Sequence, residues 1–322
     1  MNTFKNKIIL APMEGVLDAL MRDLLTSINP YDLCITEFVR VVDQLVPVHI
    51  FHKVCPELKS NALTPSGTPI RTQLLGQNPD WMAENALRAI ELGSNGVDIN
   101  FGCPANTVNK SKGGAVLLKE PEKLYQIISK VRSALGSKEQ LSVKIRLGFE
   151  NTNLFTEIID AISSSKPNVL SIHARTKKQG YKAPAHWHHI SEAVEQLKRT
   201  NSEIDVIANG EIWTREDAQK CREVANTSNI MLGRGALASP NLAYSIKQDL
   251  PRMNWLMLSE LLIKYSESEL QGDKSFYFSS RLKQWLRYIR LQYPQGEVLF
   301  QAIKLLKNKN EILSEIKRIS HN

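Results

Sequence analysis

One cysteine of this chain stands in a setting that suits proton chemistry. Cys103 lies in the stretch Asn100-Phe101-Gly102-Cys103-Pro104, directly after a short apolar segment. The glycine before it permits backbone angles that other residues resist, and the proline after it restricts the chain further. A thiol held in this way at a strand end can be aimed at a substrate. The alternative is a buried cysteine in a turn, and the rest of the chain decides between them.

Other polar residues follow short apolar segments at regular intervals. The segments predict strands at 8–11, 33–36, 70–74, 97–99, 141–145, 169–172, 205–208 and 229–232. Helix-period patterns separate them, as at 81–92 before Gly93. About eight such units over roughly 240 residues predict a (β/α)8 TIM barrel. The alternative is a doubly wound sheet, which usually carries a glycine-rich fingerprint after its first strand, and 11–15 lacks one.

The carboxyl ends of barrel strands form the active site of such folds. Their chemistry here indicates a flavin, because Gln73 offers an amide to the edge of a planar heterocycle and Lys144 offers a positive charge to an anionic reduced flavin. Asn209-Gly210 and Gly233-Arg234 follow the seventh and eighth strands, where these barrels commonly bind phosphate. Since the dinucleotide fingerprint is missing, the sequence predicts FMN rather than FAD or tightly held NAD.

The positive charge of the chain is concentrated near its C-terminus. The formal net charge is +8, and residues 246–322 carry 13 Lys and Arg against 8 Asp and Glu, a net +5. Helical patterns dominate after 251–255. We therefore expect a catalytic barrel at 1–245 and a basic helical bundle at 246–322, with a polyanion as partner.

Cysteine usage and hydropathy indicate the cellular compartment in which the protein works. Cys34, Cys55, Cys103 and Cys221 are scattered with no CxxC pair, which indicates neither a zinc site nor a disulfide framework. No apolar run approaches the roughly 20 residues of a membrane span, and the first residues lack the pattern of a secretory signal. We expect a cytoplasmic monomer that binds no metal and no membrane.

These motifs together resemble the tRNA-dihydrouridine synthases over nearly the whole chain. The resemblance is carried by APMEG at 11–15, QLLG at 73–76, DINFGCP at 98–104, VKIRLG at 143–148, HART at 173–176, ANGE at 208–211 and LGRGA at 232–236. Members of this family reduce the C5–C6 double bond of a uridine in tRNA with FMN, which NADPH re-reduces. The resemblance implies that Cys103 donates the proton to C5. It also implies an FMN site made by Pro12, Met13, Glu14, Gln73, Lys144, His173, Asn209, Gly210, Glu211, Gly233 and Arg234.

Within the family, the chain most resembles the bacterial C subfamily, which acts on uridine 16 of the D-loop. TEFVRVVDQ at 36–44 and QGY at 179–181 support this assignment. It implies tRNA contacts by Arg40, Asn100, Arg146, Tyr181, Arg281, Lys283, Tyr288 and Lys304. Lys304 stands where an arginine is expected, so the charge is kept but the bidentate fork is lost.

The helical pattern at 281–290 separates into faces. Leu282, Leu286 and Ile289 form an apolar stripe, while the other faces hold Lys283, Arg287 and Arg290, and Arg281, Trp285 and Tyr288. Basic residues beside aromatic ones suit phosphate contacts and base stacking. The alternative is a solvated charged face with a partly buried tryptophan.

Three other functions stay open. The same chemistry could serve another D-loop uridine. The chain could be a different FMN barrel reductase, such as a dihydroorotate dehydrogenase or an ene-reductase relative, although the basic helices argue against this. It could also be a catalytically silent tRNA-binding protein, which Cys103, Gln73, Lys144 and His173 argue against.

Overall fold

Parallel strands form the centre of the molecule. The computed structural model describes residues 5–110, 112–271 and 277–320 of the 322. Within these ranges the strands are β1 (Ile8–Leu10), β2 (Leu33–Arg40), β3 (Ile70–Leu75), β4 (Val97–Phe101), β5 (Leu141–Arg146), β6 (Val169–His173), β7 (Asp205–Asn209) and β8 (Asn229–Leu232). Each strand pairs in parallel with the next, and β8 pairs with β1 to close a barrel. The predicted TIM barrel is confirmed, and the doubly wound sheet is excluded because the sheet closes on itself.

Several strands run further than the sequence predicts. β5, β6 and β7 each include one more residue, namely Arg146, His173 and Asn209, and these three are partners across the ladder. Strand pairing therefore fixes the positions of these polar residues. β2 continues from Thr36 to Arg40 through a register shift, and such an irregularity interrupts the apolar alternation that marks a strand in sequence.

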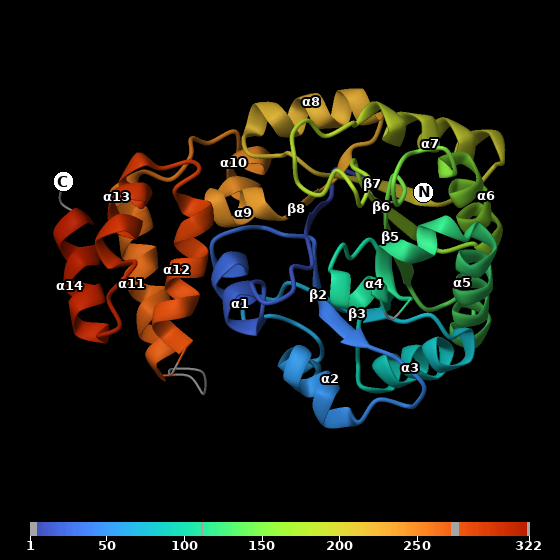
Figure 1. Ribbon diagram of the computed structural model, residues 1–322, viewed down its shortest axis with the longest axis horizontal. Helices are drawn as coiled ribbons and strands as arrows, with labels where there is room; N and C mark the ends of the chain where they lie inside the picture. The colour runs from blue at the N-terminus through green and yellow to red at the C-terminus, as the bar shows by residue number, and fades with distance from the viewer. Residues whose placement is uncertain (1–4, 111, 272–276, 321–322) are drawn as a thin grey trace.

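Helices cover the outside of the barrel (Figure 1). They are α1 (Ala19–Ser27), α2 (Val48–Val54), α3 (Pro79–Glu91), α4 (Asn106–Lys110), α5 (Pro121–Leu135), α6 (Phe155–Ser165), α7 (His188–Arg199), α8 (Arg215–Ala225) and α9 (Arg234–Ala238), with short 3-10 helices at Pro56–Ser60 and Gly114–Lys119. The start of α8 is set by a capping box, in which Thr214 and Asp217 bind each other's backbone N–H groups.

Two apolar clusters hold these layers together. A small cluster inside the barrel includes Ile9, Ile35, Ile207 and Met231. A larger one fills the space between strands and helices and continues into the C-terminal helices. The barrel interior is thus a packed core below the site, which keeps the strand ends at fixed separations.

The C-terminal region is helical, as predicted. It contains α10 (Leu242–Gln248), α11 (Trp255–Gln271), α12 (Phe278–Ile289), α13 (Pro294–Ile303) and α14 (Lys309–Ser320). Figure 1 shows α11–α14 beside the barrel, on the side where α1 and α9 lie. The boundary predicted at 245/246 falls inside α10 and stays a prediction. In the part of the chain that the structure describes, no helix is long and apolar enough to cross a membrane.

Candidate active site

A cavity of about 370 Å³ opens at the carboxyl ends of the barrel strands. Every residue predicted to contact FMN lines it: Pro12, Met13, Glu14, Gln73, Lys144, His173, Asn209, Gly210, Glu211, Gly233 and Arg234. Cys103 lines it too, and so do Asn100, Arg146, Tyr181 and Tyr288 from the predicted tRNA set. The barrel brings together residues that are more than 200 positions apart in the chain, between Pro12 and Arg234.

Cys103 lies just beyond β4, and only 9% of its surface is exposed. Its backbone N–H and that of Gly102 donate to Asn100 Oδ1 at 2.9 and 2.8 Å, which fixes the turn. Burial raises the pKa of the thiol, and Glu14 raises it further, while Lys144 and Arg146 oppose the shift. The thiol therefore stays protonated at neutral pH, which is the state that a general acid requires.

A series of buried side-chain hydrogen bonds supports this turn. Asp98 Oδ2 accepts from Gln73 Nε2 at 2.6 Å, and Gln73 Oε1 accepts from Asn100 Nδ2 at 2.8 Å. Asp98 and Gln73 are fully buried. Because a carboxylate only accepts, Asp98 orients the Gln73 amide, and Gln73 in turn orients Asn100. These hydrogen bonds connect Asp98 in the barrel interior to the backbone N–H of Cys103.

Lys144 contributes an amine to the lining of the cavity. Its Nζ lies 3.4 Å from Asn209 Oδ1, and Asn209 is itself held by a hydrogen bond to the Met231 carbonyl at 2.8 Å. Burial lowers the pKa of Lys144 to about 8, with a contribution from the charge of Arg146. The amine is therefore a charge that a neighbouring anion would stabilise strongly.

The far end of the cavity is rich in positive charge. Burial lowers the pKa of His173 well below its usual value, and the charges of Arg146, Lys144, Arg175 and Arg234 add to this effect. Burial also lowers the pKa of Arg234. These basic groups lower one another's pKa because together they create a positive potential. A positive potential suits the binding of a phosphate.

The loop after β7 fits closely against this end. Gly210 has a φ of +115°, and a Cβ there would lie 2.9 Å from the His173 ring, so only glycine suits the position. Its neighbour Glu211 pairs with Arg175 and accepts from the Trp213 indole at 2.8 Å. Trp213 lines the cavity and was absent from the predicted site, whereas the Arg175 side chain is fully buried behind Glu211. The HART and ANGE motifs pointed to their neighbourhood.

Tyr181 and Tyr288 stand at the mouth of the cavity. Tyr181 is 54% exposed, and its ring lies 4.7 Å from the guanidinium carbon of Arg234 and 5.3 Å from that of Arg146. Tyr288 comes from α12, so the helical region contributes directly to the cavity. Aromatic rings with adjacent cations suit the stacking of an extruded base.

The other predicted tRNA contacts lie outside this cavity. Lys283 and Arg281 line a groove of about 520 Å³ together with Arg287 and Gly15. Arg40 is exposed at the end of β2, and Lys304 is exposed just after α13. The tRNA contacts of these four side chains stay a prediction.

One expectation for α12 was wrong. Trp285 was grouped with Arg281 and Tyr288 as a stacking face, but only 1% of it is exposed and its indole N–H donates to the Leu237 carbonyl at 3.0 Å. The indole packs between α12 and the barrel because burying its large apolar surface there stabilises their contact. The predicted apolar stripe of Leu282, Leu286 and Ile289 is buried, as expected.

Arg281 is also placed differently from a free phosphate ligand. Its Nη2 lies 2.7 Å from Asp18 Oδ2 at the start of α1, and its Nε pairs with Glu269 of α11. The arginine side chain is 14% exposed, and that of Glu269 is 1% exposed. Arg281 therefore joins the barrel to the helical region.

Comparison with known proteins identifies the lineage of this site. Residues 9–318 match the family model of the dihydrouridine synthases. The chain belongs to the dihydrouridine synthase family. The match covers the barrel and the helical region together, so it includes every predicted site residue. The resemblance drawn from the motifs is confirmed, and an unrelated barrel reductase is set aside.

Relatives within the dihydrouridine synthase family are similar over almost their full length. A tRNA-dihydrouridine(16) synthase of Shewanella oneidensis is 51% identical over 315 residues, covering 98% of each chain. Proteins of the same name from Escherichia coli K12 and Vibrio cholerae are 50% and 48% identical, over 97% of this chain and 98% and 95% of theirs.

Solved structures share the barrel at low identity. A histamine dehydrogenase from Rhizobium has a TM-score of 0.55 and 12% identity, covering 81% of this dihydrouridine synthase and 48% of that chain. A morphinone reductase in complex with tetrahydroNAD has a TM-score of 0.51 and 11% identity, over 77% and 88%. Their similarity is one of fold.

Proposed function

We propose that this protein reduces the C5–C6 double bond of uridine 16 in the tRNA D-loop, with FMN as cofactor and NADPH as reductant. The observation that carries this proposal is the meeting of a protonated Cys103, the Lys144 amine and a cationic end in one cavity. The names of the relatives that are about 50% identical support uridine 16 as the target.

The residues of the cavity fit FMN. His173 and Arg234 line the cavity and suit its phosphate, and Gly210 lets the loop after β7 approach that end. Lys144 suits the edge of the isoalloxazine where negative charge develops on reduction. When bound, FMN reduced by NADPH supplies the hydride that reaches C6 of the uracil.

Cys103 then supplies the proton to C5. Its raised pKa keeps the proton on sulfur until the carbon becomes basic. Lys144 and Arg146 lower the pKa of the same thiol, so they stabilise the thiolate left after transfer. Asn100 uses one amide hydrogen on Gln73 and has the second for a uracil carbonyl.

Recognition of tRNA uses aromatic residues of the cavity and basic side chains outside it. The target base must leave its stack to reach the site, which costs a few kcal/mol. Tyr181 and Tyr288 offer rings to the extruded nucleotide at the cavity mouth. Lys283 and Lys304 contact backbone phosphates nearby, where each contact adds salt-dependent affinity.

A map of dihydrouridine by position, in tRNA from cells with and without the gene, tests the proposal. Loss confined to position 16, restored by the wild-type gene and not by a Cys103→Ala gene, supports it. Loss at another D-loop position would keep the chemistry and refute the choice of uridine. Unchanged dihydrouridine, or a purified protein without a flavin spectrum, would refute the proposed activity.

A further inference from the structure

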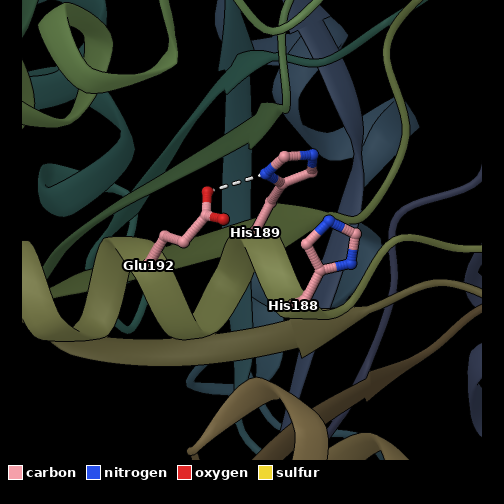
Figure 2. A group of neighbouring side chains, drawn as sticks. All are labelled: His188, His189 and Glu192. Carbon is pink, nitrogen blue, oxygen red and sulfur yellow. Dashed lines mark hydrogen bonds and ion pairs between the residues drawn. The ribbon is translucent and has the colours of Figure 1, made fainter.

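A cluster of potential metal ligands lies on α7, outside the cavity. His188 and His189 begin this helix, and Glu192 follows one turn later. Figure 2 shows the three side chains on the same side of the helix, with the His189 ring directed at Glu192. Their ligand atoms all lie within 4.8 Å of one another. We propose that His188, His189 and Glu192 bind one Zn²⁺ ion.

Helix geometry explains why the three side chains meet. At about 100° per residue, His189 and His188 lie about 60° and 40° to either side of Glu192 around the axis. Side chains on a helix lean toward its N-terminus, so Glu192 reaches back toward His189, which lies between Glu192 and His188 in Figure 2. The ring centroids of His188 and His189 are 4.2 Å apart, and His189 Nδ1 is 2.7 Å from Glu192 Oε2.

The donor set favours Zn²⁺ over Ca²⁺ and Mg²⁺. Imidazole nitrogens with one carboxylate suit Zn²⁺, whereas Ca²⁺ and Mg²⁺ prefer oxygen donors. Donors about 2.0–2.1 Å from a tetrahedral Zn²⁺ lie about 3.3–3.5 Å apart. The ligand atoms lie within 4.8 Å of one another, so binding requires rotation of these side chains, of which His188 and Glu192 are exposed and His189 is half-buried. Three protein ligands leave a fourth position for water.

The surrounding structure keeps this turn in place. Trp187, which precedes His188, donates its indole N–H to the Gly210 carbonyl at 2.8 Å. The backbone N–H of His186 donates to the Ala174 carbonyl, also at 2.8 Å.

The Glu192 carboxylate supplies the negative charge that this site needs. The N-terminal end of a helix carries a partial positive charge, which opposes a cation. Glu192 supplies the negative charge that offsets it, while the imidazoles bind as neutral ligands. The scattered cysteines predicted no zinc site. The present site depends on histidines that only the helix brings beside a carboxylate.

Titration of Zn²⁺ into the full chain without an affinity tag, against a coloured competing chelator, tests the proposal. We expect one equivalent to bind at the cluster. Outer-shell partners of a metal ligand change affinity by roughly 10–100-fold, so His188→Ala or His189→Ala should weaken binding by at least roughly tenfold. Glu192→Gln, which keeps the shape and removes the charge, should weaken it as well. His49→Ala, an exposed histidine elsewhere, should not.

Two results would overturn the site. One is an unchanged affinity in the double variant His188→Ala with His189→Ala, whose helix content is checked by circular dichroism. The other is a bound equivalent that disappears in Cys103→Ala and persists in the histidine variants, which would place the ion on the catalytic thiol. Neither result depends on the reduction of uridine.

Discussion

Replacing Arg281 should lower the free energy of unfolding, because this side chain connects the barrel to the helical region and is not a free RNA ligand. Arg281→Met removes the cation from between Asp18 and Glu269, which belong to the barrel and to α11. Burial opposes the charge of Arg281, but Tyr265, Asp18 and Glu269 around it raise its pKa above the ordinary value. The guanidinium is therefore held as a charged group between two carboxylates.

The expected loss of unfolding free energy depends on the hydrogen bonds that Asp18 and Glu269 retain in the variant. Removal of one partner from a buried ion pair costs about 3–5 kcal/mol because the other charge stays buried. Glu269 retains a hydrogen bond from the Tyr265 hydroxyl at 2.8 Å, and Asp18 still accepts from Met21 N at 3.2 Å. These contacts place the expected loss near the lower end, at about 3 kcal/mol.

Urea denaturation followed by circular dichroism measures this loss. Arg287→Met is a matched control on the same helix, because Arg287 is exposed and should change stability by less than about 0.5 kcal/mol. Arg281→Met combined with Glu269→Gln removes the unpaired buried charge, so it should be more stable than Arg281→Met alone. Wild-type stability in Arg281→Met, together with lost tRNA affinity, would refute this reasoning and make Arg281 a direct RNA ligand.

Three further predictions concern the site. Cys103→Ala should keep flavin and tRNA affinity but slow dihydrouridine formation by about 10²–10⁴-fold, the usual contribution of a general acid; near-wild-type turnover would contradict the role of the thiol. In the protein without flavin, the pKa of Lys144 is about 8 against an ordinary 10.5, so the unfolded state binds more protons between these values. Stability should then rise with pH across that window, and denaturation of Lys144→Met should show a smaller rise. Lys283→Ala should weaken tRNA binding and reduce the slope of log affinity against log salt by about 0.7–0.9, measured by filter binding from low to moderate salt; an unchanged slope would mean that Lys283 touches no phosphate.

Local sequence determined much of this protein. Alternation of apolar strands with helical patterns is a local property, so it predicted the barrel and the order of its strands. Because barrel strands all end on one face, the residues that follow them could be assigned to one site without coordinates. Cys103, Lys144 and His173 all line the observed cavity for this reason.

Tertiary structure alone decided the features that depend on contacts between distant segments. Trp285 and Arg281 lie on helical faces that read as exposed and basic, yet α12 buries one against α9 and pairs the other with Asp18 and Glu269. Glu211 lines the cavity and pairs with the buried Arg175, a partner 36 residues away in the sequence. The periodicity of a helix shows which residues share a face. It does not show which surface will cover that face, because this depends on how separate elements pack.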